Sequence, residues 1–110
     1  MSKRWYQENK RDPWRRDAKA KGYRARSAYK LKQIHEKFGI IRKGDAVLDI
    51  GCHPGGWTQV AVEEVGDSGL VIGVDMLATS PIEGAIVMVG DITEESTIEE
   101  IAGHLGNRKL

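Results

Sequence analysis

The chain has 110 residues, of which 40% are hydrophobic and 30% are charged, a composition typical of one small soluble domain. No apolar run approaches the roughly 20 residues that a membrane span requires, and no apolar segment follows the charges at the start. We therefore expect no membrane partner and no secretory signal. Cys52 is the single cysteine, which excludes a disulfide framework and favours a cytoplasmic protein.

Charge divides the chain into two parts. Residues 1–43 contain 15 Lys and Arg against 4 Asp and Glu, whereas residues 44–110 contain 2 against 12. A basic segment before an acidic body indicates nucleic-acid contact, because each cation that neutralises a phosphate releases condensed counterions. The alternative is a solvated tail without a partner.

Residues 1–26 show no sustained apolar period and are predicted to form a basic, partly flexible arm that contacts RNA. Four aromatic side chains stand among its Lys and Arg residues: Trp5, Tyr6, Trp14 and Tyr23. These rings suit stacking on unpaired bases, but they could equally pin the arm to the domain. The sequence leaves both alternatives open.

Residues 27–110 are predicted to form an α/β domain. Apolar residues at three-to-four-residue spacing predict a first helix, with Ser27 as its N-cap and Gly39 as its end. Short apolar runs then predict buried strands at 46–50, 70–75 and 85–90, and a helix at 57–65 between the first two. Right-handed crossovers predict a parallel sheet in the order 3-2-1, with the strand at 46–50 innermost.

A last helix is predicted after the third strand. Thr93 is its expected N-cap, Glu94 and Glu95 lie in its first turn, and Gly106 ends it. The apolar stripe expected on its buried face consists of Ile98, Ile101, Ala102 and Leu105.

A glycine loop links the first strand to the next helix, at the edge of the sheet where open α/β folds bind ligands. Gly51 permits a tight turn, and Gly55 and Gly56 let a ligand approach amides at a helix N-terminus. The loop lacks the Gly-Lys-Ser/Thr ending of a triphosphate-binding loop, and its spacing does not meet the dinucleotide fingerprint.

Acidic residues follow the next two strands. Asp75 ends the second strand and could accept hydrogen bonds from ribose hydroxyls, in either NAD or S-adenosylmethionine (SAM). Asp91 ends the third strand, where it could read the amino edge of adenine. Together with the glycine loop, the two acids fit an adenosine ligand without a pyrophosphate. The alternatives are a helix cap for Asp75 and a turn residue for Asp91.

Four segments resemble the FtsJ/RrmJ family of 2′-O-ribose RNA methyltransferases. They are LDIGCHPGGWTQ (48–59), RSAYKL (26–31), VIGVDM (71–76) and VGDIT (89–93). The resemblance implies the N-terminal half of a Rossmann-like SAM-dependent methyltransferase fold, preceded by the basic arm and a helix. It implies that Gly55 and Trp57 contact SAM, with Asp75 at its ribose and Asp91 near its adenine.

The same resemblance makes Lys30 the first residue of the family's catalytic Lys-Asp-Lys-Glu set. A cation there would favour alkoxide character on the attacking ribose oxygen. Without the resemblance, Lys30 would be one solvated lysine on a basic helix. Cys52 and His53 replace the small residues usual in the family, and we expect no metal at this pair.

The resemblance implies a parent protein that methylates a ribose in ribosomal RNA of the large ribosomal subunit, at a uridine. The family's other catalytic residues would lie beyond Leu110, so we expect a fragment truncated before the fourth strand and inactive alone. Its exposed sheet edge could support self-association. The alternatives are a non-catalytic module that binds SAM or RNA, a methyltransferase for transfer RNA, and a small-molecule methyltransferase that would leave the basic arm unexplained.

Overall fold

The computed structural model describes residues 22–110, so residues 1–21 of the predicted arm lie outside the described residues. The elements, in chain order, are α3 (Ser27–Phe38), β1 (Ala46–Ile50), α4 (Gly56–Val65), β2 (Leu70–Asp75), β3 (Ile86–Val89) and α5 (Glu95–Leu105). Within the described part of the chain, no helix has the length and apolar character needed to cross a bilayer. The predicted order of helices and strands is confirmed, with no helix in the described residues between β2 and β3.

The three strands form one parallel sheet in the order β1-β2-β3. Ala46 lies opposite Leu70, and Ile72 lies opposite Ile86. This confirms the predicted order, although β3 is shorter at both ends than the expected 85–90. Because all strands run the same way, the loops that follow them gather at one edge. Among residues 22–110, β1 pairs with β2 alone.

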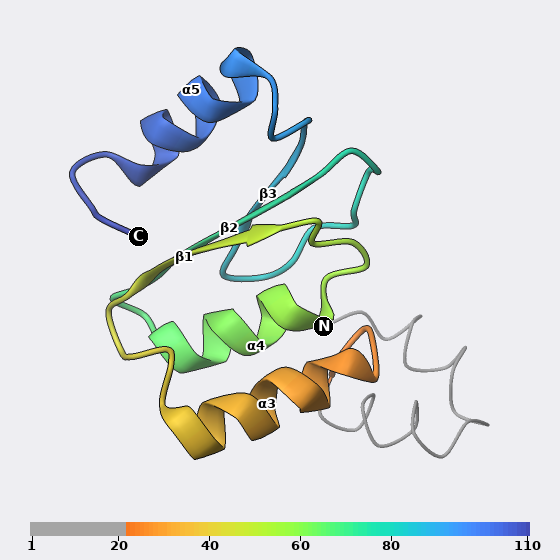
Figure 1. The fold of residues 1–110 in the computed structure, drawn as a ribbon, viewed down its shortest axis with the longest axis vertical. Helices are drawn as coiled ribbons and strands as arrows, with labels where there is room; N and C mark the ends of the chain where they lie inside the picture. The colour runs from red at the N-terminus through yellow and green to blue at the C-terminus, as the bar shows by residue number, and fades with distance from the viewer. Residues whose placement is uncertain (1–21) are drawn as a thin grey trace.

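Helices cover both faces of the sheet. Figure 1 shows α5 on one face and α4 on the other, with α3 outside α4. Alternate residues of β2 therefore enter different cores, as the two-residue period of a strand requires. The α5 side buries Ile72, Val74, Met88 and Ile101, the α4 side buries Ala61, Val65 and Val71, and a third cluster between α3 and α4 buries Tyr23, Ala28, Leu31 and Val60.

Both N-cap predictions are wrong. Ser27 is the first helical residue of α3, because Arg26 before it already has helical dihedrals (φ −61°, ψ −30°). At the other helix, Glu94 stands at the N-cap of α5 with no side-chain cap. The Thr93 hydroxyl instead donates to Asp91 Oδ1 at 2.6 Å. It therefore bonds to this carboxylate and does not cap α5.

The buried stripe of α5 also differs from the prediction. Ile98 is 48% exposed, and Ala102 is exposed, whereas Thr97 is 6% exposed and Ile101 is buried. The cause lies at Gly90, where an added Cβ would be 2.8 Å from Thr97 Oγ1. The glycine after β3 leaves the space that Thr97 fills, and Ile98, the next residue of the helix, lies toward solvent.

Candidate functional site

The glycine loop is held against the end of β2 by backbone hydrogen bonds. The carbonyl oxygen of Val74 accepts from the amides of Gly51 (2.8 Å) and Cys52 (3.1 Å). The amide of His53 donates to Asp75 Oδ2 at 2.9 Å. The sheet therefore fixes the loop's position through two adjacent residues of one neighbouring strand.

The three glycines of the loop are required for different structural reasons. Gly51 has φ +77°, and an added Cβ would meet nothing within 4 Å. A side chain there would be strained by the backbone and would project into open space. By contrast, a Cβ added at Gly55 would lie 2.6 Å from Ile82 Cδ1, and one added at Gly56 would lie 3.1 Å from Ala25 Cβ. Their small size already serves packing, so ligand approach at these two positions stays a prediction.

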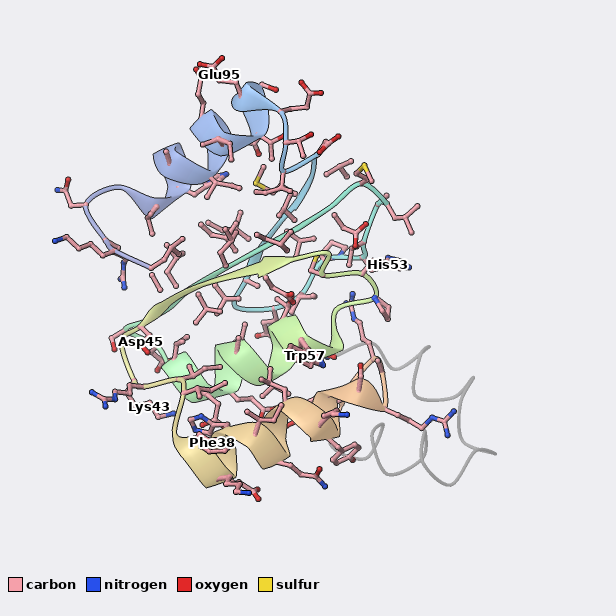
Figure 2. All side chains as sticks on the ribbon, viewed as in Figure 1. Phe38, Lys43, Asp45, His53, Trp57 and Glu95 are labelled. Carbon is pink, nitrogen blue, oxygen red and sulfur yellow. The ribbon has the colours of Figure 1, made fainter. Side chains whose placement is uncertain are left out.

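A hollow of about 410 Å³ opens beside this loop. It is lined by Ala25, Ser27, Asp49, Ile50, Gly51, Cys52, His53, Pro54, Gly56 and Trp57. The Trp57 indole, which lies at the start of α4 next to α3 (Figure 2), donates from Nε1 to the carbonyl of Ser27 at 2.9 Å. This volume falls within the roughly 300–1,000 Å³ of small-molecule sites, and the bond joins two walls of the hollow.

Two larger hollows lie on the described residues, and the first of them shares Asp49 and Trp57 with the loop hollow. One of about 670 Å³ runs along the unpaired edge of β1 and has a mainly apolar lining that includes Leu31, Ile40 and Val47. The other, of about 860 Å³, lies beside α4 and the segment Ser80 to Gly84. The loop hollow is the stronger candidate for a cofactor, because it sits at the carboxyl end of β1 and is lined by two of the predicted glycines, Gly51 and Gly56, although not by Gly55.

The two predicted cofactor acids lie at neighbouring strand ends. The amide of Gly90 donates to the backbone carbonyl of Asp75 at 3.0 Å, which joins the ends of β3 and β2. Hydrogen bonds from the amides of Leu77 and His53 lower the pKa of Asp75. The hydroxyl and amide of Thr93 lower the pKa of Asp91. Both carboxylates are therefore charged at neutral pH, but neither lines the hollow.

Lys30 lies on an exposed part of α3, one helical turn beyond Ser27. It makes no side-chain hydrogen bond or ion pair with a described residue. The structure therefore brings Gly51, Gly56 and Trp57 to one hollow and places Lys30 on a helix that Trp57 ties to it. The catalytic role of Lys30 stays a prediction.

Asp49 is a candidate that the sequence reading did not single out. It lies on β1, lines the loop hollow, and accepts a hydrogen bond of 2.6 Å from the Thr58 hydroxyl. Burial raises its pKa, although the Thr58 bond acts in the opposite direction. A partly buried carboxylate beside a cavity carries a cost in stability and is typical of functional sites. The sequence feature that could have indicated this candidate is an acidic residue two positions before Gly51.

Cys52 packs inside the loop, whereas His53 is exposed. Cys52 is 4% exposed, and Gly73 makes room for it, because an added Cβ would lie 3.0 Å from its Sγ. Burial raises the pKa of the thiol. His53 Nδ1 lies 3.1 Å from the Thr79 hydroxyl. Among residues 22–110, no three His, Cys, Asp or Glu side chains group to hold a metal.

Comparison with known proteins supplies the family. The sequence model of the FtsJ-like methyltransferases matches residues 23–110. The chain belongs to the FtsJ-like methyltransferase family. A crystal structure described as a ribosomal RNA methyltransferase from Plasmodium falciparum superposes with a TM-score of 0.69 at 30% identity, over 80% of this chain and 52% of that one. The fold is thus part of a Rossmann-like methyltransferase fold.

Two curated relatives of the family carry the name ribosomal RNA large subunit methyltransferase E. The protein from Methanothrix thermoacetophila is 54% identical over 100 residues, which are 91% of this chain and 38% of that protein. The one from Methanothermobacter thermautotrophicus is 46% identical over 110 residues, 98% of this chain and 52% of that protein. The chain therefore spans about half or less of the length of these relatives.

Proposed function

We propose that this FtsJ-like chain carries the cofactor-binding half of a SAM-dependent RNA 2′-O-ribose methyltransferase. The observation that carries the proposal is the glycine-loop hollow at the carboxyl end of β1, in a chain of this family. Gly51, Gly56 and Trp57 would line the cofactor, with Asp75 at its ribose. Asp91 would lie near its adenine, and Gly55 would support the loop.

The chemistry supplied by SAM is a methyl group bonded to a sulfonium. The residues of the chain would hold the cofactor and orient it relative to the acceptor ribose, which replaces a bimolecular encounter with a fixed geometry. Lys30 would place a positive charge near the attacking 2′ oxygen and stabilise negative charge as it develops there. The open space at Gly51 and the charged state of Asp75 both fit an adenosine with free ribose hydroxyls.

The proposed substrate is ribosomal RNA of the large subunit, at a uridine. The names of the curated relatives support the ribosomal substrate, and the basic character of residues 1–43 supports contact with RNA phosphates. A transfer RNA substrate is the alternative within the same reaction class. A ribosomal RNA substrate is consistent with the cytoplasmic location expected from the sequence, which stays a prediction.

Methyl transfer tests the proposed reaction. Ribosomal RNA is incubated with SAM labelled in its methyl group, and the products are hydrolysed with alkali. A 2′-O-methyl group protects the adjacent phosphodiester, so label in alkali-resistant dinucleotides is the expected result for a longer protein that contains this chain. Label on a base would contradict ribose specificity. For a 110-residue chain of verified mass we expect no turnover, and turnover would contradict its proposed role as the cofactor-binding half.

Replacing Asp49 with asparagine is expected to stabilise the fold and weaken SAM binding. Because the pKa of Asp49 is raised in the folded state, its charged form opposes folding above that pKa. The gain should therefore be present at neutral pH and disappear below about pH 4, where the acid is protonated in both states. We expect a melting temperature higher by about 2–4 °C at pH 7, since the carboxylate is partly screened by water.

Thermal melts at pH 7 and pH 3.5 measure the stability effect, and calorimetry with SAM measures affinity. Glu83→Gln is the matched control, since Glu83 is an exposed acid outside the loop hollow. A destabilised Asp49→Asn variant at pH 7 would contradict the assignment of a burial cost to Asp49.

We also propose that the chain self-associates through β1. Among the described residues this strand pairs on one side only, and the apolar hollow of about 670 Å³ runs along its free side. Unpaired strand edges readily pair with another chain. The Asp45 carbonyl and the Gly51 amide both bond to β2, so by the alternation of a parallel strand the Ala46 amide faces the free side. Sedimentation at increasing concentration should show a dimer that Ala46→Pro weakens, because proline removes that free amide donor. A chain that stays monomeric at 100-fold different concentrations would contradict this proposal.

A further inference from the structure

Arg24 lies just before α3, in the segment that the sequence predicts as an RNA-contacting arm. Its guanidinium instead donates to backbone carbonyls of two different loops. Nη1 donates to the carbonyl of Pro54 at 3.3 Å and to that of Ser80 at 2.7 Å, and Nη2 donates to the carbonyl of Pro81. Pro54 belongs to the glycine loop after β1, and the other two carbonyls follow β2. One planar cation therefore joins the loops that leave two adjacent strands.

The backbone of Arg24 is fixed as firmly as its side chain. Its amide donates to Gln59 Oε1 of α4 at 2.7 Å, and Gln59 Nε2 donates to the carbonyl of Gly22. The Arg24 side chain also packs beneath the glycine loop, since a Cβ added at Gly55 would lie 3.3 Å from Arg24 Cδ. The backbone of Arg24 is thus held by α4, and its side chain packs against Gly55 on the way to the two loops.

These contacts decide between two uses of a basic residue. An arginine that binds RNA phosphate presents its N–H groups to solvent, usually as a bidentate fork. In Arg24, both terminal nitrogens are already directed at protein carbonyls, and burial lowers the pKa of the guanidinium. Arginine remains charged in proteins even so, which strengthens its bonds to the carbonyl dipoles.

We propose that Arg24 is a positioning residue that braces the glycine loop against the loop after β2, and that SAM affinity depends on this brace. The inference rests on the proposed function, because Pro54, one partner of Arg24, belongs to the loop that lines the proposed cofactor hollow. Asp75 lies at the start of the second loop and binds the first one through the His53 amide. Arg24 supplies a second connection between the same two loops, farther from the sheet. A binding site whose walls are held in place before the ligand arrives loses less entropy on binding.

The test compares Arg24→Gln, Arg24→Lys and wild type in the complete chain. Calorimetry gives the SAM dissociation constant, thermal melting gives stability, and hydrogen exchange reports local order in residues 52–56 and 79–83. Arg24→Gln should weaken SAM binding by about ten-fold, the scale of one lost charge-assisted hydrogen bond. Lysine keeps the charge but lacks the fork, so Arg24→Lys should recover only part of the affinity. Exchange should quicken in both loops while β1 and β2 remain protected.

Arg42→Gln is the matched control. Arg42 is exposed in the turn before β1, and Figure 2 shows Lys43 and Asp45 of that turn at the opposite end of the sheet from His53. Its loss should leave SAM affinity unchanged. Equal affinity in Arg24→Gln and wild type would overturn the inference, and so would exchange that quickens throughout the sheet, which indicates a general structural role. If wild type itself binds no SAM, the proposed function fails, and unchanged exchange in the two loops of Arg24→Gln would separately refute the brace.

Discussion

Replacing Asp75 with alanine is expected to lower SAM affinity by about a hundred-fold or more, since several hydrogen bonds to a charged acceptor are lost together. Two of these bonds are internal, from the amides of His53 (2.9 Å) and Leu77 (2.8 Å). The proposed bonds to the ribose hydroxyls are lost as well. The variant therefore loses both a ligand contact and the link between the glycine loop and the end of β2. Titration calorimetry measures the effect directly.

The charge of Asp75 also predicts how affinity depends on pH. Because the amides of Leu77 and His53 lower the pKa of Asp75, its charged form persists to a pH below the usual carboxyl value of about 4. SAM affinity should thus stay constant between pH 8 and pH 5 as far as this group is concerned. Asp67→Ala is the matched control, because Asp67 is exposed in the turn before β2. An Asp75→Ala variant that binds SAM as tightly as this control would contradict the assigned role.

Replacing Ile72 with alanine is expected to unfold most of the chain at 37 °C. Ile72 is completely buried at the centre of β2, where it packs with Val74, Met88 and Ile101 beneath α5. Truncation of a buried isoleucine costs about 2–5 kcal/mol, because it removes apolar contacts and leaves a cavity. A domain of this size has little stability in reserve. Circular dichroism during urea and thermal unfolding measures the loss.

Ile98→Ala makes the same chemical change on α5 at a side chain that is 48% exposed. It should change the free energy of unfolding by about 0.5 kcal/mol or less. Comparison of these two variants thus distinguishes the effect of burial from the effect of residue type. If the Ile72→Ala and Ile98→Ala variants unfold at the same urea concentration, the assignment of Ile72 to the core is wrong.

The sequence predicts the strands well because their signals are local. Short β-branched runs bounded by glycine mark β1 and β2 at their observed limits, and their parallel pairing follows from the single helix α4 between them. The glycine loop is equally readable, since a positive φ at Gly51 and the tight approach at Gly55 require that residue type.

Features that depend on distant partners could not be predicted in the same way. Ile98 fits a helical stripe, yet Thr97 occupies the buried position because Gly90, seven residues earlier, leaves room for it. Arg24 reads as one cation among many in a basic segment. Its actual partners, Pro54 and Ser80, lie 30 and 56 residues away, so only the packed loops reveal its use.

Asp49 illustrates an intermediate case. Its position before the glycine loop was visible in the sequence, but its environment was not. The hydrogen bond from Thr58 and the raised pKa depend on how α4 packs against β1. The residue type alone gave no reason to select Asp49, and the fold supplied that reason.

Calorimetric titration of SAM into the 110-residue chain tests the central proposal most directly. The chain is first shown to be folded by circular dichroism, and the Asp75→Ala variant is titrated under the same conditions. We expect one SAM per chain for wild type and a large loss of affinity for the variant. A folded wild-type chain that binds no SAM would contradict the assignment of the glycine-loop hollow as the cofactor site.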